Sequence, residues 1–276
     1  MTSRGRDRQG HLLPLGMAMV LLLLAVALGA PWLAPYDPLR AVADSFGNPF
    51  PPQPAHLLGT DELGRDILSR LIYGARISLL VAAAATSMTM GIGTSIGLLA
   101  GYAGGWIDTL LMRGTDTVLA LPGLLLALAL VAIIGPGLTS ILVVIGLISW
   151  PAVARAVRAQ VLTLRERDFV LAATALGATP SRLMLRHLLP NALPTILVMG
   201  ALATSGTIVL DAGLSYLGLG VPVPTPSWGR MLSDSQTYYL VAPWLMLCPG
   251  LAILYAVVAF NFVGYGLLAR LGRDET

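Results

Sequence analysis

The chain has 276 residues, of which 56% are apolar and 11% are charged, and its mean hydropathy is +0.78. A soluble domain averages about 25% charged residues, so this chain has too few charges to cover a surface that faces water on every side. Its net charge of +3 rests on arginine, because the sequence contains no lysine. A phosphate-binding Walker loop needs a lysine, so any ATP that drives this protein must be bound by another chain.

Metal and thiol chemistry have little support in the sequence. The single cysteine, Cys248, cannot form a disulfide within the chain, so it says nothing of the redox compartment. His11, His56 and His187 are widely separated, and no cluster of cysteine and histidine with metal-ligand spacing exists. We therefore expect neither a metal site nor a catalytic centre.

Residues 12–34 form the first predicted transmembrane helix, after a polar N-terminal segment at 1–11. No charged residue stands between Arg8 and Asp37, and about 20 helical residues suffice to cross ~30 Å of hydrocarbon. A cleavable signal peptide, cut near Ala27, is the alternative. The apolar run is long for a signal core, so we favour the membrane helix.

Residues 35–76 form a predicted extracytoplasmic loop. Six prolines prevent regular structure in its first half. From Thr60 onward we predict an amphipathic helix at the membrane interface, with Ile67, Leu68, Leu71 and Ile72 on its apolar side. Another expectation for this segment is structural: Asp61 caps the helix, and Arg65 pairs with a neighbouring acid.

Five further spans follow in a core domain at 77–268, before a short tail at 269–276. The second span is 77–100, two lie within 117–161 around a Gly-Pro-Gly turn at 135–137, and the last two are 193–210 and 243–268. Loops are expected at 101–116 and 211–242.

Two features of these spans predict how they pack. Gly91, Gly93 and Gly97 in the second span allow a neighbouring helix to approach closely in lipid. Pro122 should kink the third span, because proline removes one backbone hydrogen bond.

Arginine counts predict the orientation. Six spans place both termini on one side. With the termini in the cytoplasm, the inner segments hold twelve arginines and the outer loops hold five, which agrees with the positive-inside rule. The prediction is an all-α, polytopic membrane protein of six transmembrane helices whose segment 165–190 is cytoplasmic.

The segment 165–190 is the most highly charged interruption in the second half of the chain. At its start, one helix face carries residues at i, i+3, i+4 and i+7, namely Phe169, Ala172, Ala173 and Leu176. Gly177 stands where a glycine would end this helix.

A second helix is predicted directly after the first. Thr179 and Pro180 have the residue types of an N-cap and a first helical position. Pro190 and Pro194 should then break the chain before the fifth span. The segment is therefore expected to be a helical hairpin between two spans.

The first helix of this hairpin has two possible uses. Small side chains facing the cytosol would let a partner approach the backbone, as when a helix docks in a groove. Alternatively, Phe169 and Leu176 pack back on the protein's own bundle. The periodicity alone does not decide between the two.

Asp211 is a carboxylate at the outer end of the predicted fifth span. Ionisable residues in membrane spans are functional candidates by default. With Ser215 and Tyr216 it is a candidate for a gate or for the solute path. The alternative is a structural hydrogen bond to the backbone of the outer loop.

Three segments resemble the permeases of ABC importers for dipeptides, oligopeptides and nickel. The pattern Ala-Ala-x-x-x-Gly at 172–177, followed by Leu-Pro at 189–190, resembles their "EAA" loop, although Leu171 replaces the expected glutamate and His187 an aliphatic residue. Residues 58–70 resemble the signature Leu-Gly-Thr-Asp-x-x-Gly-Arg-Asp-x-x-Ser-Arg of the C-type subunit. Residues 211–229 resemble a third segment, with Asp211 in place of glutamate and Tyr216 in place of phenylalanine.

The resemblance implies the type I importer permease fold and a bacterial inner-membrane location. It implies a heterodimer with a second homologous permease, two ATP-binding subunits that carry ATP and magnesium, and an extracytoplasmic solute-binding protein. No cofactor is implied on this chain. The cytoplasmic hairpin would couple to the ATPase through Asp168, Phe169, Ala172, Ala173, Leu176, Gly177, Leu189 and Pro190. Arginines beside the hairpin would contact anionic membrane lipid rather than nucleic acid or nucleotide.

Peptide is the solute we expect, with nickel or another small solute of the same family as the alternative. An intramembrane protease would need a second membrane aspartate or a serine paired with histidine. A stand-alone, proton-coupled carrier would need buried acids or histidine relays. The predicted spans supply neither set.

Overall fold

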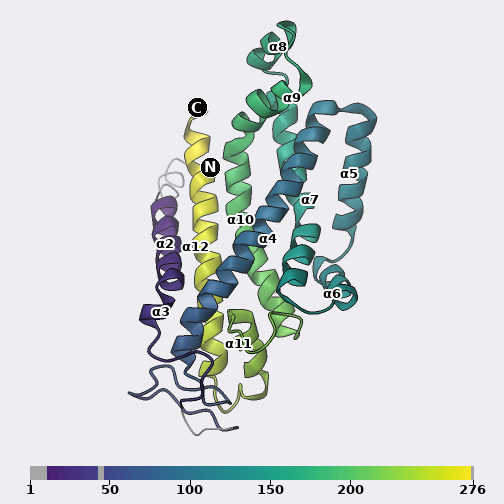
Figure 1. Ribbon diagram of the computed structural model, residues 1–276. Coiled ribbons are helices and arrows are strands. Elements are labelled where there is room, and N and C mark those ends of the chain that lie inside the picture. The colour runs from purple at the N-terminus through teal and green to yellow at the C-terminus, as the bar shows by residue number, and fades with distance from the viewer. Residues whose placement is uncertain (1–10, 43–46, 275–276) are drawn as a thin grey trace.

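The structure is a computed structural model that describes residues 11–42 and 47–274, and it is a bundle of helices (Figure 1). Within these residues the only β-pairing is three isolated bridges in the segment 41–66. The predicted polar N-terminus falls almost entirely outside the described residues. The helices are α2 (Leu12–Leu28), α3 (Ala30–Leu33), α4 (Ile67–Ala103), α5 (Gly105–Ala120), α6 (Gly123–Ile134), α7 (Leu138–Leu164), α8 (Asp168–Ala175), α9 (Pro180–Arg182), α10 (Leu189–Tyr216), α11 (Trp228–Asp234) and α12 (Trp244–Asp274).

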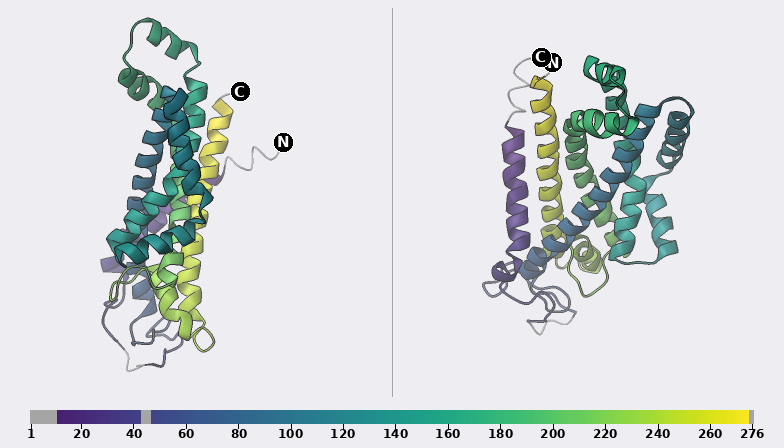
Figure 2. Two further views of the ribbon diagram at one scale, coloured as in Figure 1. Left: turned by 90° about the vertical axis from the view of Figure 1, so that its right-hand side faces the viewer. Right: turned by 45° about the horizontal axis from the view of Figure 1, so that its top comes forward.

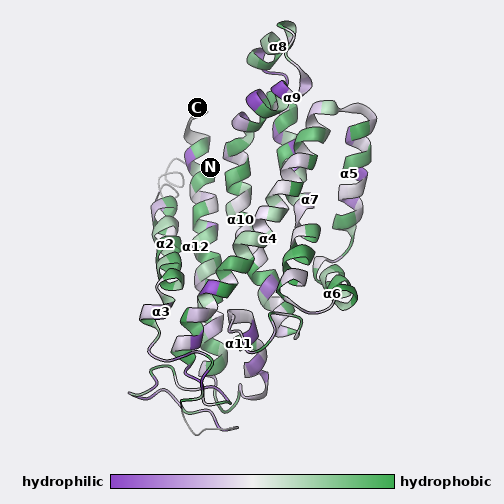
Figure 3. Ribbon diagram, in the orientation of Figure 1, coloured by the Kyte–Doolittle hydropathy of each residue, from purple (hydrophilic) through white to green (hydrophobic). Residues whose placement is uncertain are grey.

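Six apolar segments correspond to the six predicted spans. Four helices are long and apolar enough to cross a membrane, and the bent pair α5–α6 makes a fifth if it is counted as one span. The 17-residue α2 is a shorter apolar helix. Figure 3 shows hydrophobic residues along these helices, with hydrophilic residues concentrated near α9 and α11.

The bundle has two distinct ends. Helix α8 projects from one of them, here called the hairpin end (Figures 1 and 2). The segment 35–66 and α11 lie at the opposite end, here called the distal end. The beginning of α2 and the final turns of α12 point toward the hairpin end.

Glycines allow the close contact between α2 and α12. A Cβ added to Gly16 would lie 2.6 Å from the backbone nitrogen of Val263, and one added to Gly266 would lie 2.4 Å from that of Leu13. Real Cβ atoms do not approach backbone so closely. The two helices can therefore lie this near to each other only because glycine has no side chain at these positions.

The predicted glycine seam is confirmed in part, between α4 and α7. A Cβ on Gly93 would lie 2.6 Å from Val153 Cβ, and one on Gly97 would lie 2.5 Å from the carbonyl oxygen of Ala154. Gly91 does not belong to the seam, because a Cβ added there would meet nothing within 4 Å. Gly101 completes the seam one turn further along, where an added Cβ would lie 2.8 Å from Val161 Cβ.

The separate amphipathic helix from Thr60 onward is not found. Helix α4 begins at Ile67 and continues without a break to Ala103, so its first turns are continuous with the second span. Asp66 is the N-cap: its carboxylate accepts hydrogen bonds from the backbone N–H of Ser69 at 2.8 Å and from its hydroxyl at 2.8 Å. A helix starts where the orphan N–H groups find an acceptor, and Asp66 supplies one.

The predicted loop at 101–116 is also wrong. A positive φ at Gly104 and Gly105 turns the chain, and α5 begins immediately at Gly105. Pro122 does more than kink the third span: α5 and α6 meet at an angle of 90°. Proline cannot donate the hydrogen bond that would continue α5, so α5 ends before Pro122, and α6 covers most of the predicted third span.

Pro190 and Pro194 do not break the chain as predicted. Residues Pro180–Tyr216 form one long helical run, with a π-helical turn at Leu183–Leu188 just before the prolines. The side-chain amide of Asn191 donates a hydrogen bond of 2.6 Å to the His187 carbonyl. The π-helical turn, which ends where the Leu189 N–H donates to the Met184 carbonyl, changes the hydrogen-bond register directly before the prolines.

Candidate functional site: the projecting hairpin and the distal cluster

Helix α8 is the best-defined candidate for contact with a partner. It begins at Asp168, two turns of helix project beyond the bundle, and it ends at Ala175 (Figures 1 and 2). Gly177 has φ +79°, and the Ala178 N–H donates a 3.1 Å hydrogen bond to the Ala173 carbonyl. This is the predicted glycine stop: a left-handed residue closes the helix and satisfies its last carbonyls.

The second part of the hairpin also begins as predicted. Thr179 is the residue before the first turn of α9, and Pro180 occupies its first position. The Thr179 hydroxyl makes no capping bond to the backbone, so proline's fixed φ is the main helix-starting feature here.

Two apolar side chains of α8, and that of Leu176 directly after it, are exposed. Phe169 is 41% exposed, Leu171 55% and Leu176 89%. The alternative in which Phe169 and Leu176 pack back on the bundle therefore does not describe this structure. Phe169 and Leu176 lie on one side of the helix, and exposed apolar side chains that share a face are characteristic of interaction sites.

Val170 anchors α8, and the sequence analysis missed it. It is 3% exposed and packs in a cluster with Val161 of α7 and with Leu183 and Leu188 of the π-helical turn. Ala173, three residues later, is partly buried against the same cluster. The i, i+3 spacing of these two residues was the available signal.

The other hairpin residues that were predicted to contact the ATPase differ in their exposure. Asp168, Ala172, Gly177 and Pro190 are exposed. Leu189 is partly buried against the cluster that holds Val170.

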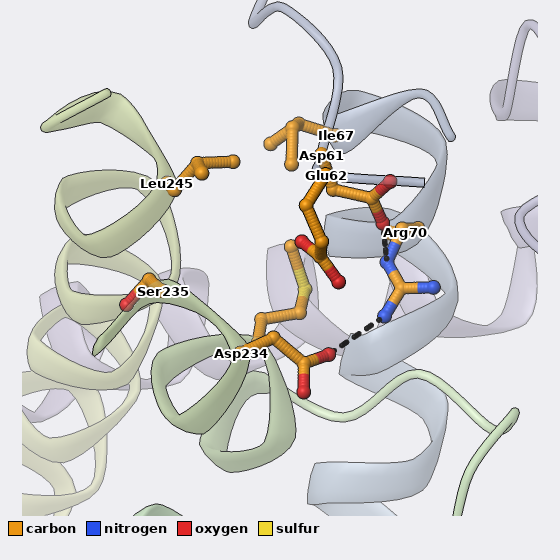
Figure 4. Close-up of a pocket in the computed structure, with 8 residues that line it drawn as sticks. Asp61, Glu62, Ile67, Arg70, Asp234, Ser235 and Leu245 are labelled. Carbon is orange, nitrogen blue, oxygen red and sulfur yellow. Dashed lines mark hydrogen bonds and ion pairs between the residues drawn. The ribbon is translucent and has the colours of Figure 1, made fainter. Parts of the chain in front are cut away.

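At the distal end, six charged side chains from distant segments form an ionic cluster. Arg70 of α4 is 3% exposed and lies 3.3 Å from Asp61 and 3.5 Å from Asp234 of α11. Figure 4 shows Asp61, Glu62 and Asp234 around the Arg70 guanidinium, beside a small cavity of about 10 Å³. The remaining ion pairs of the cluster are Arg65–Asp61 at 2.6 Å, Arg65–Glu62 at 3.6 Å and Arg230–Asp234 at 2.8 Å.

This cluster explains the charged part of the segment 58–70. Arg65 pairs with an acid as predicted, whereas the capping role belongs to Asp66 rather than Asp61. The Asp61 carboxylate instead accepts the backbone N–H groups of Leu63 and Arg65, both at 2.9 Å. The segment therefore joins the distal loop to α4 and α11 and has a structural role.

The pKa of the Glu62 carboxyl group predicts how the stability contributed by this cluster depends on pH. Burial raises the pKa of its carboxyl group, and the neighbouring Asp61 charge adds to the increase. A raised folded-state pKa means that the stability contributed by Glu62 is fully present below its unfolded pKa and falls as pH rises through the folded pKa. We expect Glu62→Gln to be at least as stable as the parent at pH 7, with the difference vanishing as pH falls toward 4.

Thermal unfolding of the purified protein between pH 4 and pH 8 measures this. Asp61→Asn is the matched control, because it removes one partner of a buried ion pair and should cost about 3 kcal/mol at pH 7. A Glu62→Gln variant that loses stability at pH 7 would contradict the prediction.

Asp211 and Ser215 lie inside the bundle and not in an outer loop. Helix α10 continues to Tyr216, so both residues are in its last two turns, 4% and 0% exposed. Asp211 Oδ1 and Ser215 Oγ make no hydrogen bond of good geometry with the described residues. Tyr216 is 39% exposed, and its carbonyl accepts a 2.6 Å hydrogen bond from Gln236. The predicted structural hydrogen bond from Asp211 to the loop backbone is absent from the described residues.

The segment 211–229 packs through its small residues. Cβ atoms added to Gly220 and Gly229 would lie 2.5 Å and 2.6 Å from Ser215 Cβ, so Ser215 is held between two glycines. Trp228, 2% exposed, donates its ring N–H to the Leu71 carbonyl at 3.0 Å and its backbone N–H to the Ser78 hydroxyl at 3.1 Å. These contacts attach α11 to α4.

Two comparisons identify the relatives of this chain. Residues 93–275 match the family of binding-protein-dependent transport system inner membrane components. The chain is 46% identical to the di/tripeptide transport system permease protein DppC of Pseudomonas aeruginosa, over 91% of this chain and 84% of that protein. It is 42% identical to the glutathione transport system permease protein GsiD of Pectobacterium atrosepticum, over 90% of this chain and 82% of that protein.

A solved structure shares the fold. The inward-facing MetNI methionine ABC transporter matches 75% of this chain and 96% of its own chain, with a TM-score of 0.60 and 20% sequence identity. The predicted type I importer fold is thereby confirmed. By its length of match and its identity to these relatives, this chain belongs to the family of binding-protein-dependent transport system inner membrane components.

Proposed function

We propose that this chain is the permease subunit of an ATP-driven importer that moves di- or oligopeptides across the bacterial inner membrane. The observation that supports it most strongly is 46% identity with a di/tripeptide permease across 91% of the chain. Relatives named for glutathione, itself a peptide, support the same solute class. Nickel, the alternative solute, is named in none of these relatives.

In the proposed assembly, the solute path forms between this chain and a second, homologous permease. Two ATP-binding subunits carry ATP and magnesium, and a solute-binding protein delivers peptide from outside. The hairpin end faces the cytoplasm, in line with the arginine distribution. This chain then has no catalytic residues and no cofactor of its own.

The proposed contact with the ATPase is α8. Phe169 and Leu176, seven residues apart, are exposed on one side of a helix that Val170 and Ala173 attach to the bundle. A short helix with an uncovered apolar side fits a groove on a partner. ATP-driven movement of that partner would pass to α7 and α10, which flank the hairpin.

Among the candidates for the gate or the solute path, Tyr216 is the one that the structure leaves accessible. Asp211 and Ser215 are covered by neighbouring helices in this conformation. Their proposed role is therefore conditional on a movement of α10 against α11, and Tyr216 is the residue to test first for contact with solute.

Uptake by the reconstituted complex tests the function. Proteoliposomes containing the two permeases and the two ATPases should accumulate labelled dialanine. Accumulation should require ATP on the side of the membrane that carries the ATPases and the binding protein on the opposite side. Liposomes containing this chain alone are the control. Uptake by the chain alone would support a stand-alone carrier, and uptake of nickel without dialanine would overturn the solute assignment.

A further inference from the structure

Helices α5 and α7 share an ion pair that is open on one side. Arg155 of α7 lies 2.5 Å from Asp116 of α5, and their side chains are 52% and 48% exposed. Residues one turn away on either side of Arg155, Ala152 and Ala159, are also exposed. The pair therefore belongs to a continuous open face of α7.

The position of this pair along the helices places it within the membrane. Helix α7 has 27 residues, about 40 Å at 1.5 Å per residue, against ~30 Å of hydrocarbon. Arg155 is nine residues before Leu164, about 14 Å from that end of the helix. Asp116 is eleven residues after Gly105, about 17 Å into α5. If α7 is centred in the bilayer, Arg155 lies several ångströms inside the hydrocarbon together with Asp116, its ion-pair partner. Arg155, which the sequence count placed among the inner arginines, then belongs to the span.

Contact with lipid hydrocarbon would be unfavourable for a helix face that carries this ion pair. A charged residue at this depth costs several kcal/mol against hydrocarbon, and charged residues in spans face a bundle interior or a water-filled cavity. An arginine can extend its long side chain toward the interface, but aspartate is too short to do so. The open side of the pair must therefore face water or another protein.

We propose that Asp116 and Arg155 line the aqueous solute path and bind the charged termini of a peptide, the carboxylate on Arg155 and the ammonium on Asp116. This inference rests on the proposed function and names a contact site for its solute. A peptide in its zwitterionic form carries one charge complementary to each member of the pair. Arginine also matches a carboxylate geometrically, through two parallel N–H donors.

A second ion pair between α5 and α7, Arg158–Asp108, differs from Arg155–Asp116 in geometry and exposure. Arg158 contacts both carboxylate oxygens of Asp108, through Nε and Nη2, each at 2.5 Å, and the side chains are 31% and 16% exposed. Arg155 uses a single nitrogen toward Asp116. Arg158–Asp108 therefore holds α5 on α7, whereas Arg155 and Asp116 keep donor and acceptor positions open to a solute.

Water access is tested first, independently of transport. In a Cys248→Ser background, Ala152→Cys is placed one turn from Arg155, and the complex is treated with a charged, membrane-impermeant thiosulfonate with and without ATP. Labelling in at least one nucleotide state is expected. Leu254→Cys, on an exposed apolar position of α12, is the control that should stay unlabelled. Protection of Ala152→Cys in every state, with cross-linking to the second permease, would overturn the proposal in favour of a subunit contact.

Charge selectivity is tested next, with dialanine and dialanine amide as probes. For each permease the ratio of the two uptake rates is measured, so that the selectivity of the binding protein cancels between variants. Arg155→Gln should reduce that ratio about ten-fold, the effect of one charge-assisted contact. Asp116→Asn should do the same for dialanine against its N-acetyl derivative.

Arg158→Gln is the matched control and should slow all probes by the same factor. If Arg155→Gln also slows all probes equally, the pair has a structural role and the proposed binding site is wrong. Failure of every permease, including the parent, to move any peptide would instead count against the proposed function.

Discussion

Leu176→Glu is expected to lower peptide-stimulated ATP hydrolysis of the assembled importer at least ten-fold while leaving the permease folded and inserted. Leu176 is 89% exposed at the end of α8, so the substitution removes no contact within this chain. In the complex, the new carboxylate would be buried without a partner against an apolar groove. Burying an unpaired charge costs far more than one lost apolar contact.

The measurement is ATP hydrolysis by the reconstituted complex with and without binding protein and peptide, together with co-purification of the ATPase. Ser181→Glu is the matched control, since Ser181 is also exposed but lies on α9, outside the apolar cluster of α8. Normal stimulation in Leu176→Glu would show that α8 is not the contact. Equal loss in both variants would indicate a general effect of negative charge on the hairpin.

Ala173→Glu would be a less informative test of the same contact. Ala173 is partly buried against the cluster that contains Val170, so a glutamate there would also detach α8 from the bundle. Such a variant would lose coupling for two reasons at once.

Gly97→Ala is expected to destabilise the protein by about 1–3 kcal/mol or more, the usual cost of overpacking. The added Cβ would lie 2.5 Å from the Ala154 carbonyl oxygen, which is backbone and cannot rotate away. Helix α4 would have to separate from α7 along the seam of Gly93, Gly97 and Gly101. Because α7 leads directly to α8, coupling should weaken along with stability.

Gly91→Ala is the matched control on the same helix, because nothing lies within 4 Å of the added Cβ. Alanine is the better helix former by roughly 1 kcal/mol, so Gly91→Ala should be neutral or stabilising. Thermal unfolding in detergent and the yield of folded protein measure both variants. Equal stability of the two would show that the α4–α7 contact is not as close as the structure has it.

Hydropathy and local residue types were enough to predict much of this molecule. Six apolar segments, the glycine stop at Gly177 and the helix start at Pro180 depend on solvent preference and on backbone torsions of single residues. Such properties belong to a residue and its near neighbours, so they can be recognised without knowing what packs nearby.

The effect of a proline on its helix could not be predicted from the neighbouring residues in the sequence. Pro122 separates two helices at 90°, yet Pro190 and Pro194 stand inside one continuous run. The difference comes from the surroundings: a π-helical turn, packed through Leu183 and Leu188, changes the hydrogen-bond register directly before Pro190. Whether a freed carbonyl finds another donor depends on neighbouring groups, which periodicity does not reveal.

The order of residues alone was sufficient to establish the membrane class, the resemblance to peptide-importer permeases and the presence of a hairpin between two spans. The packed helices were needed to show that Val170 anchors α8 while Leu176 is free, that Asp211 is covered, and that Arg70 joins Asp61 to Asp234 across more than 160 residues of sequence. The physical reason is that apolar composition decides whether a helix enters lipid, whereas the side that it buries depends on which other helices reach it.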